Sequence, residues 1–357
     1  MKVLVVGDAM IPGKKIGDIA EKYFSKYGAT IEVMDWKTKD KVELQNRRIN
    51  VEKNGPSAEA PPAGMLQKVA DADILMVHYT PVARVVFEAA KRLKIVGTCR
   101  AGLENLDVKA ATDHRIAAFN IMGRNAEAVS DFAMGLMLAE ARNIARSHAA
   151  LKQGKWLKDF SNVATIPNMR EKIIGLIGFG YVGQLMARKA QGFNMTVLVY
   201  DPYMADEIIH QHKAKKETIE NIFKVSDFVS IHARLTDATK GLISASLINS
   251  MKPTAYLINT ARAGLVVHEA LYKALKEKRI CGAALDVFET EPLPAGHPLM
   301  SLDNVTITSH LAGTTVESLT DSPRLLAEDI DLLLSGKTPR WVNNKDVLTG
   351  FVPVEKW

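Results

Sequence analysis

Short apolar runs alternate with segments of helical periodicity along the first third of the chain. The runs lie at residues 3–6, 31–34, 74–77, 95–96 and 116–119. Strands that are buried on both faces read as continuous apolar runs, and the helices between them cover the two faces of the sheet. The pattern therefore predicts an α/β domain built on a parallel sheet.

The second half of the chain contains six further candidate strands. They lie at residues 173–177, 196–200, 228–231, 255–259, 282–286 and 305–308, and helical segments separate most of them. Six strands in this arrangement match two βαβαβ halves, which together make a complete dinucleotide-binding sheet. The predicted fold class is therefore α/β, with two doubly wound parallel-sheet domains.

Two segments outside these strands have patterns of their own. The polar, proline-bearing stretch at residues 47–64 predicts no packed element, and we interpret it as a surface excursion. A long helix is predicted at residues 125–148, with Asn125 as its N-cap and Gly154 as a stop signal. Apolar residues extend around most of this helix, so it must be buried on most sides. It lies either between domains or at a subunit interface, and we favour the interface of a homodimer.

Composition and charge narrow the class of protein. The 357 residues suit two domains of ordinary size, and the 47% hydrophobic and 24% charged contents are globular values. The net charge of +6 comes from scattered Lys and Arg residues, which indicates a solvated surface that tolerates anionic substrates rather than a nucleic-acid site. The N-terminus predicts a short strand rather than a signal peptide, and no apolar run approaches a membrane span. We therefore expect a cytosolic (cytoplasmic) protein.

The cysteines and histidines predict neither disulfides nor a metal. Cys99 and Cys281 are too few for a disulfide framework, and they cannot build a Cys-rich zinc site. His210 and His212 diverge on a helix, because side chains two residues apart do not share a face. No metal is expected.

The most informative motif is G-x-G-x-x-G, formed by Gly178, Gly180 and Gly183 directly after an apolar strand. The first glycine permits a tight turn, the second lets the backbone approach a pyrophosphate, and the third allows the helix to pack close to the strand. Asp201 ends the next strand, where its carboxylate accepts hydrogen bonds from ribose hydroxyls and repels a 2′-phosphate. The motif predicts a dinucleotide site that prefers NAD to NADP.

Polar residues follow three of the late strands, at the edge where such sheets bind ligands. Arg262 follows one strand, Asp286 and Glu291 follow the next, and His310 follows the last. Taken singly, each is more often structural than catalytic. Jointly they supply a cation for a carboxylate, a titratable group that moves a proton, and a carboxylate that orients this group. Reduction of a keto acid requires this combination.

Several motifs in the same order resemble the D-isomer-specific 2-hydroxyacid dehydrogenases. They span about residues 70–340 and read GTCRAGLENLDV, GRNAEAVSDF, GFGYVG with Asp201, SIHARLTDATKGLI, LINTARAGLV, LDVFETEP and SHLAG. The resemblance implies an NAD-dependent oxidoreductase that interconverts a D-2-hydroxy acid and its 2-keto acid. It also implies that a Rossmann NAD-binding domain, residues 123–311, is inserted into a flavodoxin-like substrate domain made of residues 1–122 and 312–357.

The same resemblance implies a role for individual residues. Arg262 matches the arginine that holds the substrate carboxylate, Glu291 the catalytic glutamate, and His310 the acid/base histidine that protonates the carbonyl oxygen. The residues expected at the cofactor are Gly178, Gly180, Tyr181, Val182, Gly183, Asp201, Ala233, Thr260, Ala261, Asp286 (near the carboxamide), His310 and Gly313. Those expected at the substrate are Tyr79, Arg100, Ala101, Gly102 and Arg262.

Two departures from the family pattern leave the substrate open. Arg234 stands where the family commonly has proline, and either a cofactor contact or a simple surface substitution explains it. His78 and Tyr79 stand where an arginine is often found, which weakens the case for 3-phosphoglycerate, although Arg100 is placed to replace that charge. Phosphoglycerate, hydroxypyruvate or glyoxylate, and a sugar-derived hydroxy acid all remain candidates. The alternative from another class is an NAD(H)-sensing corepressor-type binding protein on the same fold.

Overall fold

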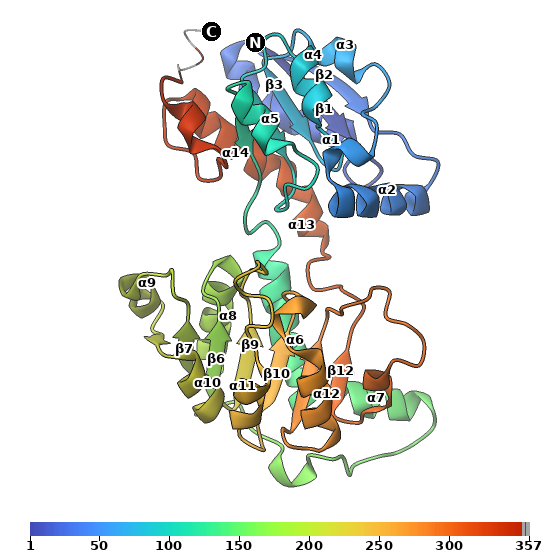
Figure 1. Cartoon of the computed structure of the whole chain (residues 1–357), viewed down its shortest axis with the longest axis vertical. Helices are drawn as coiled ribbons and strands as arrows, with labels where there is room; N and C mark the ends of the chain where they lie inside the picture. Colours follow the sequence, from blue (N-terminus) through green and yellow to red (C-terminus); the bar gives the residue numbers. More distant parts are fainter. Residues whose placement is uncertain (352–353, 355–357) are drawn as a thin grey trace. The chain divides into compact units, whose positions relative to one another are not determined.

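The computed structural model describes residues 1–351 and residue 354, and it contains two compact units. The first unit comprises Met1–Arg124 with Thr315–Trp357, and the second comprises Asn125–Thr314. The chain thus changes unit at 124–125 and again at 314–315, where the sequence predicted 122–123 and 311–312. Figure 1 labels most of the helices and strands of both units.

The first unit is built on a five-stranded parallel sheet with the order β2-β1-β3-β4-β5. Its strands are β1 (Lys2–Gly7), β2 (Thr30–Asp35), β3 (Ile74–Val77), β4 (Ile95–Thr98) and β5 (Ala117–Phe119). This is the flavodoxin-like order, in which the chain reverses direction across the sheet between β1 and β3. All five strands coincide with predicted apolar runs, and every residue of β3, β4 and β5 is buried.

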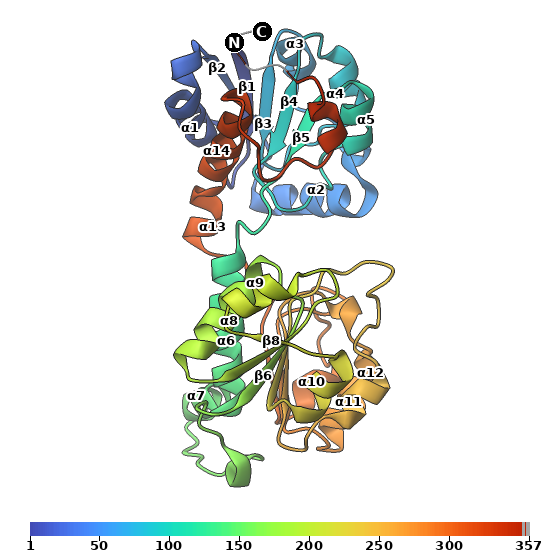
Figure 2. The same cartoon turned by 90° about the vertical axis from the view of Figure 1, so that its left-hand side faces the viewer.

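Helices cover both faces of this sheet (Figure 2). The helices of this unit are α1 (Gly13–Phe24), α2 (Lys41–Asn54), α3 (Met65–Val69), α4 (Arg84–Ala89), α5 (Val108–Asp113), α13 (Val316–Thr320) and α14 (Ser322–Leu334). One core joins α1 and α14 to the sheet, and a second core joins α3, α4 and α5 to the opposite face. Helix α14, from the C-terminal part of the chain, therefore completes the unit that the first helix begins.

Helix α2 overturns part of the prediction for residues 47–64, because this stretch begins inside a 14-residue helix. A reciprocal cap starts the helix: Asp40 accepts a hydrogen bond from the Glu43 N–H at 2.8 Å, and the Glu43 carboxylate accepts one from the Lys39 N–H at 2.6 Å. Only Leu44 and Val51 of the helix are fully buried apolar residues. The helix is polar on most sides, which explains why its hydrophobic pattern does not reveal it.

The second unit is built on a seven-stranded parallel sheet with the order β12-β11-β10-β9-β6-β7-β8. Its strands are β6 (Ile173–Ile177), β7 (Thr196–Tyr200), β8 (Lys215–Lys216), β9 (Phe228–Ile231), β10 (Tyr256–Asn259), β11 (Gly282–Leu285) and β12 (Val305–Ile307). Six of the seven were predicted. The missed strand β8 consists of two lysines at the edge of the sheet and carries no apolar signal. The predicted fold class of two doubly wound parallel sheets is confirmed.

Helices again cover both faces of this sheet (Figure 2). They are α6 (Ala126–Ala141), α7 (Ile144–Lys152), α8 (Tyr181–Gly192), α9 (Asp206–Gln211), α10 (Ile219–Val225), α11 (Ala245–Ser250) and α12 (His268–Lys276). One core contains residues of α6 and α8, and the other contains residues of α10, α11 and α12. Among the described residues, no helix has both the length and the apolarity that crossing a bilayer would require.

The helix predicted at residues 125–148 is in fact two helices. Asn143 has a left-handed backbone (φ 57°) between α6 and α7, and its side chain donates to Asn162 at 2.7 Å. Ala133, Met134, Met137 and Ala141 of α6 pack into the core of their own unit. The nearly all-round apolar pattern of this helix is thus explained largely by burial within one unit, so it does not by itself require a partner subunit.

Candidate active site

The glycine-rich turn after β6 has the geometry that a dinucleotide requires. Gly178 has φ +94°, and a Cβ there would lie 2.6 Å from the backbone N of Ala233. A Cβ on Gly183 would lie 2.4 Å from the carbonyl oxygen of Gly178, so the close approach of helix to strand needs glycine. A Cβ on Gly180 would meet no atom within 4 Å. Backbone atoms therefore pack closely against Gly178 and Gly183, whereas the space beside Gly180 is free for a ligand.

This open side lies at the beginning of helix α8. Its N-cap residue is Gly180, which has no side chain that caps the helix, and Tyr181 and Val182 form its first turn. The start of a helix presents backbone N–H groups and the positive end of the helix dipole, which bind phosphate oxygens. The residues present therefore fit the pyrophosphate of a dinucleotide.

Asp201 directly follows β7 and holds the glycine-rich turn in place. Its carboxylate accepts hydrogen bonds from the backbone N–H groups of Phe179 (2.8 Å), Tyr203 (2.9 Å) and Met204 (3.0 Å). The bond to Phe179 ties the acid directly to the glycine-rich turn. Recognition of ribose by Asp201 stays a prediction, and the structure adds a second role that the sequence did not indicate.

The turn after β10 carries Thr260, Ala261 and Arg262. Buried Asn259 fixes this turn, because its side chain accepts from the Ala261 N–H and donates to the Arg262 carbonyl, each at 3.0 Å. The hydroxyl of Thr260 is buried and has no hydrogen-bond partner in the described part of the chain. The exposed Arg262 guanidinium has no carboxylate partner among the described residues, so its charge is available for a ligand anion.

His310 and Glu291 form a hydrogen-bonded pair. Nδ1 of His310 lies 2.7 Å from Oε2 of Glu291, and Oε1 of Glu291 accepts from the Phe288 N–H at 2.9 Å. The side chains are 46% and 35% exposed. The carboxylate is therefore anchored on one oxygen and orients the imidazole with the other. Since Nδ1 faces Glu291, Nε2 is the ring nitrogen that remains for proton exchange with a substrate.

Asp286 supports the turn that carries His310. Its fully buried carboxylate accepts hydrogen bonds from the Thr308 hydroxyl (2.6 Å) and from the N–H groups of Leu311 (2.9 Å) and Ala312 (2.8 Å). His310 has a left-handed backbone (φ 56°) within the turn. The resemblance placed Asp286 near the nicotinamide carboxamide, which stays a prediction; the structure shows it holding the Thr308 side chain before His310 and the backbone after His310. At the end of this turn, a Cβ on Gly313 would lie 2.7 Å from the Asn125 side chain.

The predicted substrate contacts of the first unit lie at the carboxyl ends of β3 and β4. Tyr79 and Arg100 are nearly buried, and the Arg100 guanidinium lies 4.4 Å from the centre of the Tyr79 ring. The carbonyl of Ala101 accepts from the Asn120 side chain, and a Cβ on Gly102 would collide with the Glu104 carboxylate. Helix α2 brings Arg48 and Glu52 to the same place, and no motif in the sequence had indicated either residue.

A buried pair, Asp8 and His78, lies where the strand order of the first unit reverses. Oδ2 of Asp8, after β1, lies 2.8 Å from Nδ1 of His78, after β3. Both side chains are fully buried, and Nε2 of His78 has no partner in the described part of the chain. Burial, together with the nearby charges of Arg124 and Arg100, lowers the pKa of His78, although the hydrogen bond that His78 donates to Asp8 opposes this shift.

This lowered pKa predicts a loss of stability in acid. The folded protein binds fewer protons than the unfolded chain once the pH falls below the ordinary histidine value of 6.5, so the free energy of unfolding should decrease from there downward. His78→Asn should flatten this dependence, whatever its effect at neutral pH. Melting temperatures between pH 7.5 and 5.5 test this, with His114→Asn as the control in the same unit. Equal slopes for the wild type and His78→Asn would contradict the prediction.

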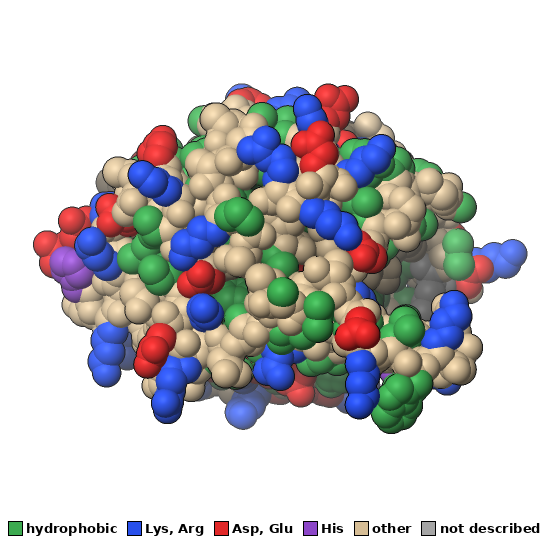
Figure 3. All heavy atoms as spheres, turned by 90° about the horizontal axis from the view of Figure 1, so that it is seen from below, with side chains coloured by type: hydrophobic (Ala, Val, Ile, Leu, Met, Phe, Trp, Pro, Cys, Tyr) green, Lys and Arg blue, Asp and Glu red, His purple; other side chains and the backbone are tan. Residues whose placement is uncertain are grey.

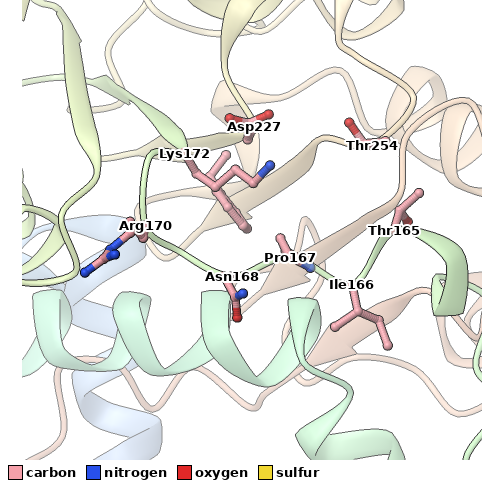
Figure 4. A pocket seen from close by; sticks show the side chains of 9 residues that line it. Thr165, Ile166, Pro167, Asn168, Arg170, Lys172, Asp227 and Thr254 are labelled. Atoms are coloured by element: carbon pink, nitrogen blue, oxygen red, sulfur yellow. The ribbon is translucent and has the colours of Figure 1, made fainter.

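One cavity of the second unit does not belong to this site. A cavity of about 440 Å³ is lined by residues that include Thr165, Arg170, Lys172, Asp227 and Thr254 (Figure 4). Lys172, Asp227 and Thr254 precede β6, β9 and β10, so the cavity lies at the amino ends of these strands. Sheets of this kind bind their ligands at the opposite, carboxyl ends.

On the face shown in Figure 3, Lys and Arg side chains are interspersed with Asp and Glu.

Comparison with known proteins agrees with this geometry. Residues 134–312 match the family model "D-isomer specific 2-hydroxyacid dehydrogenase, NAD binding domain". The chain is 39% identical to D-3-phosphoglycerate dehydrogenase from Methanocaldococcus jannaschii over 78% of its own length, and it spans 53% of the length of that protein. It is 36% identical to glyoxylate reductase from Korarchaeum cryptofilum, with 81% of this chain and 89% of that protein covered.

A solved structure shows the same fold. The NAD-complexed D-isomer-specific 2-hydroxyacid dehydrogenase from Lactobacillus delbrueckii ssp. bulgaricus matches with a TM-score of 0.76 at 20% identity, with 96% of this chain and 100% of that chain covered. At this identity the likeness concerns the fold alone. The sequence relatives and the family model show that the chain belongs to the D-isomer-specific 2-hydroxyacid dehydrogenases and that its cofactor is NAD.

Proposed function

We propose that the protein interconverts a small D-2-hydroxy acid and its 2-keto acid, with His310 as the acid/base group. The observation that carries this proposal is the 2.7 Å pair of His310 and Glu291 at the carboxyl end of the NAD-binding sheet. Relatives are named D-3-phosphoglycerate dehydrogenase, glyoxylate reductase and hydroxypyruvate reductase. The substrates in these names share a carboxylate beside an oxidisable or reducible carbon.

His310, Glu291 and Arg262 each have a separate role in the reduction. When bound, NADH supplies the hydride. Protonated His310 donates from Nε2 to the carbonyl oxygen of the keto acid, and the Glu291 carboxylate stabilises the imidazolium through Nδ1. Arg262 holds the substrate carboxylate with two parallel N–H groups, which fixes the reacting carbon in one orientation. In the oxidative direction neutral His310 accepts the proton of the hydroxyl group.

Other histidines are poorer proton donors than His310. His78 is fully buried beside Asp8. Desolvation lowers the pKa of His232 to about 4, so its imidazole is neutral near pH 7 and has no proton to give. His310 combines solvent exposure with a carboxylate partner.

A screen of NADH oxidation over a panel of 2-keto acids tests the function. The panel should include hydroxypyruvate, glyoxylate, pyruvate and phosphohydroxypyruvate. We expect turnover with at least one of them. Tight NADH binding with no turnover on any 2-keto acid would contradict the proposal and would favour the corepressor-type binding protein.

Cofactor choice gives a separate prediction. The wild type should prefer NADH to NADPH, because the Asp201 charge repels a 2′-phosphate. Asp201→Asn should reduce the preference for NADH over NADPH, because it removes the charge. The amide keeps an oxygen that can accept a hydrogen bond from the Phe179 N–H. The ratio of kcat/KM for the two cofactors measures the effect. A wild type that prefers NADPH would refute the role given to Asp201.

We also propose that the protein forms a homodimer, through α7 and the segment that follows it rather than through α6. Large apolar side chains are exposed there: Ile144, Leu151, Trp156 (77% exposed), Leu157, Val163 and Ile166. Contiguous exposed apolar residues mark interaction surfaces. Sedimentation should show a dimer at micromolar concentration, and the double variant Trp156→Lys with Leu157→Lys should shift it to monomer. Val42→Lys, at an exposed position on α2, is the control, and a monomeric wild type would overturn this proposal.

A further inference from the structure

The segment that follows β9, residues 232–236, lies directly against the glycine-rich turn after β6. The N–H of His232 donates to the carbonyl of Ile177 at 2.7 Å, one residue before this turn. A Cβ on Gly178 would lie 2.6 Å from the backbone nitrogen of Ala233. Strand β6 lies between β9 and β7 in the sheet, so the segment borders the glycine-rich turn on the side away from β7.

The other end of the segment lies against the turn that carries Arg262. Cδ2 of Leu235 lies 3.2 Å from the position that a Cβ on Gly264 would take. Arg234 therefore stands between Ala233, at the glycine-rich turn, and Leu235, at the Arg262 turn. All of these residues belong to the second unit.

The fold makes no use of the Arg234 guanidinium. The side chain is exposed, and it forms no ion pair or hydrogen bond with the described residues, Asp237 of the same loop included. The loop is held by other groups: the Thr239 hydroxyl donates to the Arg234 carbonyl at 2.7 Å and accepts from the Thr236 N–H at 2.8 Å. The positive charge of Arg234 is therefore available for a ligand.

The glycine-rich turn itself carries no positive side chain. Residues 178–184 contain no Lys or Arg, and the first basic residue of α8 is Arg188. The nearest charge is negative, because the Asp201 carboxylate accepts from the Phe179 N–H at 2.8 Å. The start of a helix contributes only roughly half of an elementary charge, whereas both phosphates of a pyrophosphate are ionised at neutral pH. A full positive charge beside the turn therefore complements the cofactor, and Arg234 is placed to supply it.

We propose that Arg234 binds the pyrophosphate of NAD from the side of β9 and thereby sets the affinity of the enzyme for its cofactor. A guanidinium presents two parallel N–H groups, which match a pair of phosphate oxygens. Arg234 and the start of α8 then contact the pyrophosphate from different sides. The sequence left a cofactor contact and a surface substitution equally open for this residue, and the unpaired charge beside the turn favours the cofactor contact.

Arg234→Gln tests this directly, because it removes the charge and keeps a polar side chain. The affinity for NADH, measured by fluorescence titration, should fall about tenfold, which is the typical effect of losing a hydrogen bond to a charged group. The difference from the wild type should shrink as the salt concentration rises, because counterions screen an exposed charge. Arg234→Lys should recover part of the affinity, since it keeps the charge but not the two parallel N–H groups.

Lys224→Gln is the matched control. It removes an exposed positive charge of the same unit at the end of α10, before β9 rather than after it. Its affinity for NADH should equal that of the wild type. Without cofactor, Arg234→Gln should melt at the wild-type temperature, because its side chain has no partner in the described part of the chain. The rise in melting temperature on adding NADH should be smaller in Arg234→Gln than in the wild type.

ADP and adenosine, each measured by competition against NADH, locate the contact on the cofactor. Arg234→Gln should bind ADP more weakly than the wild type does and should bind adenosine equally well. Equal losses for ADP and adenosine would place Arg234 at the adenine, and a larger loss for NADPH than for NADH would place it at the ribose 2′ position. Either result would overturn the proposal, as would an unchanged affinity for NADH in Arg234→Gln.

Discussion

His310→Ala is expected to lose about 10²–10⁴-fold in kcat for reduction, the usual contribution of a general acid. The loss should fall on kcat rather than on NADH binding, because the glycine-rich turn and Asp201 do not depend on the imidazole. Single-turnover reduction and NADH fluorescence titration measure the two effects separately. His297→Ala changes another histidine of the second unit, at the N-cap of the short helix Pro298–Ser301, and should keep nearly full activity.

The role of Glu291 is tested in the same assay. Glu291→Gln removes the carboxylate that orients Nδ1, so kcat should fall, but by less than in His310→Ala because the proton donor is still present. Glu289→Gln changes an exposed glutamate two residues away and should have little effect. If His310→Ala reduced the best substrate at nearly the wild-type rate, the acid/base assignment would be wrong.

Arg262→Ala is expected to cost about 2–5 kcal/mol of substrate binding, the range for loss of one partner from a hydrogen-bonded charge pair. At 1.36 kcal/mol per factor of ten, this equals roughly 30- to 5,000-fold in kcat/KM. Arg262→Lys should recover only part of the loss, because a point charge cannot reproduce the two parallel N–H groups.

Affinity for NADH should change little in either Arg262 variant, since the phosphate and ribose contacts are predicted to lie after β6 and β7. Arg279→Ala removes an exposed arginine that donates to the Asn249 carbonyl and serves as the control. Steady-state kinetics with varied keto acid measure the effect. An unchanged kcat/KM in Arg262→Ala would show that another cation holds the carboxylate.

The backbone pattern of this protein was largely predictable from local sequence. Parallel strands buried on both faces must be continuously apolar, so β6, β7 and β9 coincide with their predicted runs. Gly178 and Gly183 were predictable for a related reason, because only glycine fits a positive φ or a Cβ position already filled by backbone. Family membership followed from several such motifs in order. The elements that were missed have weak local signals. Strand β8 consists of two lysines, and the cap that starts α2 lies before residues 47–64, the stretch for which no packed element was predicted.

Tertiary structure decided how the polar side chains are shared. The sequence predicted that Asp286, Glu291 and His310 would meet at one edge of a sheet. It did not predict that the Asp286 carboxylate accepts its hydrogen bonds from backbone N–H groups of the turn that carries His310. It also made Arg100 a candidate for an anionic substrate group. Glu52, 48 residues away, neutralises that guanidinium once α2 has folded over the sheet. Sequence shows which charges exist, whereas the charge that a ligand meets depends on which partners the fold brings within hydrogen-bonding distance.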